Sequence, residues 1–130
     1  MADIQTTEDV QLLVDAFYRD ALRDPEIGPF FTEVAQIDLE AHLPKMYAFW
    51  ESILFKTHTY RGNAFVPHMD LHRKKPMRPA HFQRWLTLFE ATVDRYFEGE
   101  KAQMAKDRAR QIASMMQQKL SRLATLETNP

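Results

Sequence analysis

The stretch that decides the fold class is residues 80–98, AHFQRWLTLFEATVDRYFE. Its large apolar side chains recur every three or four positions, at Phe82, Trp85, Leu86, Phe89, Val93, Tyr96 and Phe97. This spacing puts them on one face of an α-helix. Pro79 suits the first helical position, and Gly99 supplies a stop. The stretch therefore predicts a long amphipathic helix whose apolar face packs against other helices.

The residues after Gly99 predict a second long helix, from about Glu100 to Leu123. One of its faces carries small and medium-sized apolar residues, at Ala105, Ala109, Ile112, Ala113, Met116, Leu120 and Leu123. Small side chains allow two helices to approach closely. Because the connection at Gly99 is short, we expect an antiparallel helix pair.

Upstream, the sequence predicts one more helix followed by an irregular corner. Residues 6–9, Thr-Thr-Glu-Asp, match the capping box of a helix start, and an apolar stripe continues from Val10 to Leu22. Asp24-Pro25 should end this helix. Residues 24–31 combine two prolines and a glycine with three large apolar residues, a mixture typical of a tight turn or short helix whose side chains point inward.

A further helix is predicted from Asp38, which can act as its cap, to about Lys56. Pro44 complicates this helix, because proline fits best in a first turn. The helix should therefore either begin near Leu43 or be kinked at Pro44. The alternating pattern of a β-strand is found nowhere in the sequence, so the predicted fold class is all-α.

Composition and charge restrict the function classes. The chain has 130 residues, 45% of them hydrophobic and 27% charged, which predicts a single globular domain over residues 1–130. Seventeen basic residues balance 18 acidic ones, so neither nucleic-acid nor membrane binding is expected. The absence of cysteine excludes disulfides and thiolate chemistry. Because the first residues lack a basic and apolar leader, we expect a cytoplasmic protein. We also expect a monomer.

Attention therefore turns to the histidines, above all to His68. It lies on a short segment after a proline, beside Phe65, Val66, Met69 and Leu71. A buried histidine satisfied by a hydrogen bond would fit this pattern, and so would the axial ligand of a haem, which needs an imidazole beside an apolar slot. Phe82 and Trp85 could form a wall of such a slot or could simply be core residues.

Other polar residues leave similar alternatives open. If they are buried, the Tyr18 hydroxyl and the Trp85 indole N–H each need a hydrogen-bond partner, and a backbone carbonyl could be that partner. His42 could face a pocket or water. His68 and His72 are four residues apart, as in some zinc sites, but the sequence has no His-Glu-x-x-His motif and no carboxylate cluster near them.

The order and spacing of several motifs resemble those of the group III truncated haemoglobins, a branch of the bacterial 2-on-2 globin family. The resemblance covers about residues 8 to 120. It is carried by Phe17-Tyr18, Asp24-Pro25 with Gly28-Pro29-Phe30-Phe31, His42 through Phe49-Trp50, Tyr60-Arg61-Gly62, Pro67-His68-Met69-Asp70-Leu71 and Phe82 through Phe89.

The resemblance implies a truncated globin fold, a 2-on-2 helical sandwich around one haem b. It implies that His68 is the proximal ligand of the iron. Tyr18 and Trp85 match the positions of distal hydrogen-bond donors, and His42 matches a distal histidine that can gate the pocket. The remaining residues implied to bind the cofactor are Phe31, which stacks on the macrocycle, Met46 and Phe49 on the distal side, Lys45 at a propionate, and Phe65 and Phe82.

The function expected from this resemblance is tight binding of dioxygen, nitric oxide or other diatomic ligands. Dioxygen bound to haem carries partial negative charge, so an O–H and an indole N–H aimed at it would form charge-assisted hydrogen bonds. Such a pocket suits oxygen, nitric-oxide or reactive-species metabolism. The alternatives are a haem enzyme of the peroxidase or nitric-oxide dioxygenase type, served by an external reductase, and a haem-free helical interaction module.

Overall fold

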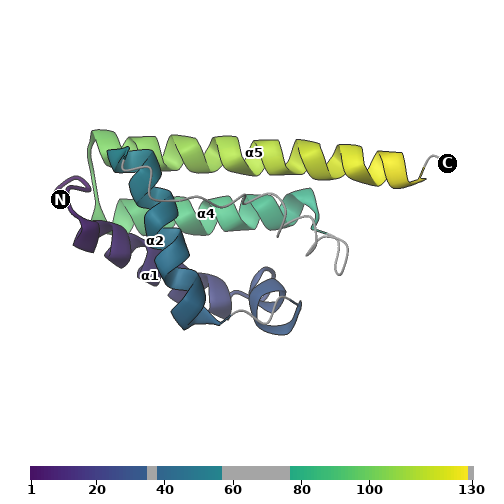
Figure 1. The fold of residues 1–130 in the computed structure, drawn as a ribbon, viewed down its shortest axis with the longest axis horizontal. Helices are drawn as coiled ribbons and strands as arrows, with labels where there is room; N and C mark the ends of the chain where they lie inside the picture. Colours follow the sequence, from purple (N-terminus) through teal and green to yellow (C-terminus); the bar gives the residue numbers. More distant parts are fainter. Residues whose placement is uncertain (35–37, 57–76, 129–130) are drawn as a thin grey trace.

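The computed structural model describes residues 1–34, 38–56 and 77–128, and within these ranges every regular element is helical (Figure 1). The all-α fold class predicted from the sequence is confirmed in these ranges. None of these described helices combines the length and apolarity needed to cross a lipid bilayer. In chain order the elements are α1 (Thr7–Arg23), the π-helical turn η1 (Phe30–Val34), α2 (Leu39–Phe55), α4 (Pro79–Tyr96) and α5 (Glu100–Thr128).

The predicted antiparallel pair is formed by α4 and α5, which lie side by side (Figure 1). Pro79 is the first residue of α4, as its missing N–H favours. The small residues of α5 are buried against the aromatic helix, with Ala105 and Ala109 fully enclosed. The last helix continues to Thr128, beyond its predicted end at Leu123.

The corner between α4 and α5 is closed by the N-terminal segment. The Asp3 carboxylate accepts hydrogen bonds from the backbone N–H groups of Lys101, at 2.9 Å, and Ala102, at 2.8 Å. It thereby caps the start of α5 from a distant part of the chain. Gly99 has a φ of +146°, and a Cβ on it would lie 2.5 Å from the Asp3 Cγ. Glycine is therefore required here both by the backbone conformation and by the capping carboxylate.

The start and end of α1 agree with the sequence pattern. Thr6 Oγ1 accepts a hydrogen bond from the Asp9 N–H at 3.1 Å, and the Asp9 carboxylate accepts one from the Thr6 N–H at 3.1 Å, which completes the capping box. The helix ends at Arg23, directly before Asp24. Its apolar stripe forms much of the core, through Val10, Leu13, Val14, Phe17 and Ala21.

Helix α2 packs against α1 and α5 and contains Pro44 within its length. Asp38 caps it by accepting a hydrogen bond from the Glu40 N–H at 3.1 Å, so the alternative start near Leu43 is wrong. Although α2 is rich in large apolar residues, only Trp50 and Leu54 are buried. The others remain partly exposed, at Leu43, Met46, Tyr47, Phe49, Ile53 and Phe55.

The corner after α1 points its side chains inward, as predicted, and Asp24 holds it together. Asp24 is only 5% exposed, and Ile27 and Phe30 are buried beside it. Its carboxylate accepts backbone hydrogen bonds from Glu26 and Ile27, and it pairs with the Arg84 Nε at 2.6 Å. This contact ties the corner to α4 next to Trp85.

Replacing Asp24 by asparagine is expected to lower the free energy of unfolding at pH 7 by about 1.5–3 kcal/mol, the range for hydrogen bonds to charged groups. Because the Arg84 side chain is 41% exposed, the lower end applies. Burial favours a higher pKa for Asp24, but Arg84 and the N–H groups of Ile27 and Glu26 outweigh it and lower the pKa. The stabilisation is therefore present above about pH 4 and is lost as the pH falls through the lowered pKa of the folded state.

Urea unfolding of both proteins in the same haem state, at pH 7 and below pH 4, checks this expectation. Asp94→Asn is the matched control, because Asp94 pairs with Lys106 at 2.7 Å but is itself exposed. Exposed pairs contribute at most about 1 kcal/mol. Equal losses of unfolding free energy in Asp24→Asn and Asp94→Asn would contradict a structural role for the buried Asp24 carboxylate.

Candidate functional site

The centre of the candidate site is a hydrogen bond between α1 and α2. The Tyr18 hydroxyl lies 2.8 Å from the His42 Nε2, with the two rings edge to face and their centroids 5.2 Å apart. Tyr18 is only 9% exposed, and its burial raises the pKa of the phenol. The hydroxyl therefore keeps its proton at neutral pH and can donate a hydrogen bond. His42 is half-buried and turned toward Tyr18.

Aromatic rings from two further elements extend this centre. Phe31 of η1 contacts Tyr18 edge to face, with a centroid distance of 5.7 Å. On the other side, Phe17 contacts both Tyr18, at 5.3 Å, and Trp85 of α4, at 5.9 Å. The three residues implied to form the distal pocket, Tyr18, His42 and Trp85, thus belong to one continuous group of side chains.

Further along α2, Met46 and Phe49 follow His42 by four and seven residues, so they lie on the same side of the helix. Both are half-buried and pack against the core cluster. Lys45, beside them, is exposed. This face of α2 is an apolar wall that the described part of the protein leaves partly uncovered, with a cation at its edge.

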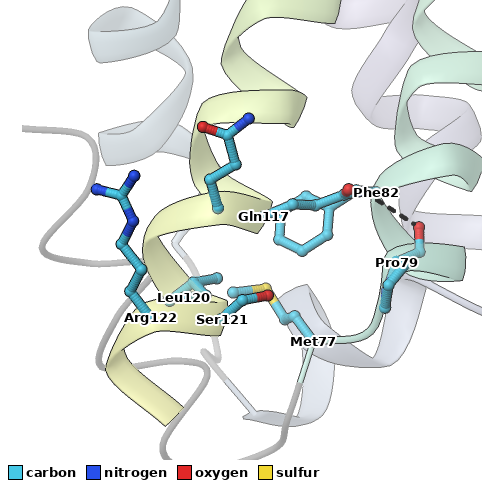
Figure 2. A pocket seen from close by; sticks show the side chains of 8 residues that line it. Met77, Pro79, Phe82, Gln117, Leu120, Ser121 and Arg122 are labelled. Atoms are coloured by element: carbon cyan, nitrogen blue, oxygen red, sulfur yellow. Dashed lines mark hydrogen bonds between the residues drawn. The ribbon is translucent and has the colours of Figure 1, made fainter. Parts of the chain in front are cut away.

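Phe82 belongs to a second, smaller apolar cluster near the start of α4. A pocket of about 430 Å³ opens there between the start of α4 and the end of α5 (Figure 2). Its size falls within the range of small-molecule and cofactor sites. Trp85 packs against both this cluster and the core cluster that contains Tyr18. The pocket is lined by Met77, Pro79, Phe82, Gln117, Gln118, Leu120, Ser121 and Arg122.

His68 and Phe65 lie outside the described residues, as does His72, so the proximal ligand stays a prediction from the sequence. In residues 1–34, 38–56 and 77–128, no group of three or more histidine and carboxylate side chains could hold a metal ion. The residues that the resemblance places on the distal side, Tyr18, His42, Met46, Phe49 and Trp85, are all among the described residues.

These residues fit a haem. A flat apolar macrocycle needs partly uncovered aliphatic and aromatic side chains, and α2 provides Met46 and Phe49. A polar donor must remain protonated in an apolar setting, and Tyr18 does so. The acidic edge of the macrocycle needs a cation near solvent, and Lys45 is exposed.

Several features of the site were missed by the sequence analysis. The four-residue spacing of Trp85 and Phe89 could have predicted their contact, since such residues are neighbours on a helix. Trp50 stacks on Phe89 from a different helix, at a centroid distance of 4.7 Å, and no local pattern predicts this contact. The hydrogen bond from the Tyr47 hydroxyl to Asp15 was missed for the same reason.

Comparisons with known proteins agree with this geometry. Residues 2–121 match the sequence profile of a family described as bacterial-like globin. The group 3 truncated haemoglobin of Campylobacter jejuni is 28% identical over 116 residues, which cover 87% of this chain and 89% of that protein. The crystal structure of the group III truncated haemoglobin from Campylobacter jejuni superposes with a TM-score of 0.80 and 27% identity, covering 92% of this chain and 95% of that one. The resemblance found in the sequence is confirmed.

Proposed function

This chain belongs to the bacterial-like globin family, which implies haem binding, and we propose that it holds haem b and binds diatomic gases tightly in a polar pocket. His68 is the proposed metal ligand. The bound haem supplies an iron atom at which dioxygen or nitric oxide can bind. The side chains proposed to contact the haem are Phe31, Lys45, Met46, Phe49, Phe65, Phe82 and Trp85.

The observation that carries this proposal is the buried Tyr18 hydroxyl beside His42. A hydroxyl has one proton to donate. Tyr18 can give it to His42 or to a gas ligand that carries negative charge, but not to both at once. A ligand in the pocket must therefore compete with the Tyr18–His42 bond, and Trp85 offers a second donor through its indole N–H.

A charge-assisted hydrogen bond stabilises the bound gas by about 1.5–3 kcal/mol. Two such donors favour tight holding over rapid release, so we assign the protein to oxygen, nitric-oxide or reactive-species metabolism. Its length and globular composition support the further proposal that residues 1–130 form one domain. The monomeric state and the cytoplasmic location stay predictions.

A second candidate function is enzymatic, at the same site. The same donors that hold a negatively charged gas could stabilise the charge that develops when a peroxide is cleaved. Dioxygenation of nitric oxide would use them similarly. Both reactions consume electrons from an external reductase. Stopped-flow turnover with nitric oxide or hydrogen peroxide and a reductant separates these enzymes from a protein that only binds gas.

Haem titration of the purified protein tests the proposed function. We expect a Soret band, and we expect the haem-loaded form to melt at a higher temperature than the haem-free form, because a ligand bound only by the folded state stabilises it. At a free haem concentration of roughly 100 times the Kd the stabilisation is about 2.7 kcal/mol. Protein that develops no Soret band would instead support the haem-free interaction module.

A further inference from the structure

Three aromatic rings form a stack that leads from the candidate site into the core. On α4, the rings of Trp85 and Phe89 are nearly parallel, with an interplanar angle of 10° and centroids 5.7 Å apart. Phe89 also stacks on Trp50 of α2, at 4.7 Å and 19°. Phe89 and Trp50 are buried in the same core cluster, whereas Trp85 borders the candidate site. We call these three residues the aromatic stack.

Tyr47 lies closer to the surface than Trp50 and Phe89. It precedes Trp50 by three residues on α2, so the two are neighbours on the helix, and it packs against the same core cluster. Its hydroxyl donates a hydrogen bond to the exposed carboxylate of Asp15 on α1. Burial and this hydrogen bond raise the pKa of Tyr47 to about 12, so the phenol is neutral at pH 7.

We propose that the aromatic stack, continued by Tyr47, is a route by which an oxidising equivalent leaves the haem site and reaches the protein surface. The proposal rests on the haem binding proposed above. Indole and phenol rings lose an electron far more readily than a phenyl ring. In this route Trp85, Trp50 and Tyr47 are therefore the residues that lose an electron in turn. The Phe89 ring lies between the two indoles and is not itself oxidised.

The oxidant in this proposal is hydrogen peroxide. Its complete reduction to two molecules of water takes up two electrons and two protons. The protein supplies the two electrons as the O–O bond breaks and the first water leaves; the second oxygen atom leaves as water, with two protons from solvent, once the reductant has returned the electron to the haem. One electron comes from the haem iron. The other comes from Tyr47 by way of Trp50 and Trp85, and the phenol proton passes to Asp15. An external one-electron reductant such as ascorbate then returns both electrons in two steps, and Asp15 gives the proton back to Tyr47.

Proton transfer explains why the route ends at Tyr47. A tyrosine that loses an electron must also release its phenol proton, and the Asp15 carboxylate is already hydrogen-bonded to it. Tyr18 lies nearer the site and could pass its proton to His42, but it is buried, away from an external reductant. Tyr47 is half-buried, so an external reductant can reach it.

The experiment exposes the haem-loaded full chain to one equivalent of hydrogen peroxide with a nitrone spin trap, and peptide mass spectrometry locates the adducts. We expect the main adduct on Tyr47. In Phe89→Leu the Tyr47 adduct should be lost and one on Trp85 should appear. Asp15→Asn should lose the Tyr47 adduct because the proton acceptor is gone. Phe97→Leu is the matched control, because Phe97 is also buried in the same cluster but contacts Tyr96 instead of the aromatic stack.

Tyr47 labelling that persists in Phe89→Leu, or a main adduct on Tyr18 or Tyr60, would overturn the route. If Phe89→Leu does not fold, Trp50→Phe keeps an aromatic ring in place but removes the indole, and it should lose the Tyr47 adduct as well. Haem-free protein treated in the same way should show no Tyr47 adduct. A chain that gives no Soret band with haem would contradict the proposed function itself, whereas a loaded chain labelled elsewhere contradicts only the route.

Discussion

Replacing His68 by alanine is expected to abolish most haem retention and the spectrum of five-coordinate ferrous haem. A globin haem is held by an axial imidazole together with apolar contacts. Phe65 and Val66 precede His68 and can supply such contacts but no ligand. Absorption spectra of the reduced protein, and the rate at which haem passes to an acceptor protein, measure the loss.

His72→Ala is the matched control, because His72 lies four residues further along the same segment. It should keep the wild-type spectrum and the wild-type rate of haem loss. Added imidazole should restore a histidine-ligated spectrum to His68→Ala, because the small molecule can occupy the position of the missing side chain. An unchanged ferrous spectrum in His68→Ala would assign the ligand to another residue.

Replacing Tyr18 by phenylalanine is expected to speed dioxygen dissociation roughly tenfold to a hundredfold. This range corresponds to the loss of one charge-assisted hydrogen bond of about 1.5–3 kcal/mol. Most of the effect should appear in the off-rate, because the bound ligand loses a hydrogen bond. Carbon monoxide carries little negative charge, so its dissociation should hardly change. Because Trp85 can partly compensate, the lower end of the range is expected.

Stopped-flow mixing and flash photolysis measure both off-rates. Tyr47→Phe is the matched control, since it also removes a hydrogen-bonded hydroxyl between α1 and α2 but leaves the Tyr18–His42 pair in place. Removal of both Tyr18 and Trp85 should cost more than either alone, without strict additivity, because the two donors share a ligand. Equal dioxygen off-rates in wild type, Tyr18→Phe and the double variant would rule out the polar pocket.

Local patterns were sufficient to predict most of the helices. Helix starts are set by local features: the capping box at Thr6, the aspartate cap at Asp38 and the proline that begins α4. Each acts on groups within a few residues, so its effect can be inferred from the neighbouring residues in the sequence. Pro44 shows the limit of such rules. Its position inside α2 costs one backbone hydrogen bond, but α2 is also held by packing against α1 and α5, and tertiary packing can outweigh a local preference.

The candidate site depended more on resemblance than on pattern. Spacing alone left Tyr18, His42 and Trp85 with ordinary structural roles, and only the order of motifs along the chain implied a common pocket. The structure brings these three side chains into one group. His68 and Phe65 lie outside the described residues, so the roles proposed for them continue to depend on the sequence.

By itself the sequence determined the helical class, the inward faces of α1, α4 and α5 and the residue types available for chemistry, because periodicity, caps and composition act over a few residues. Only the tertiary structure decided which distant groups meet. Tyr18 and His42 are 24 residues apart, and Asp24 and Arg84 are 60 apart. Such pairs form when apolar burial brings the helices together, and a buried polar group then needs whatever partner the packing places beside it.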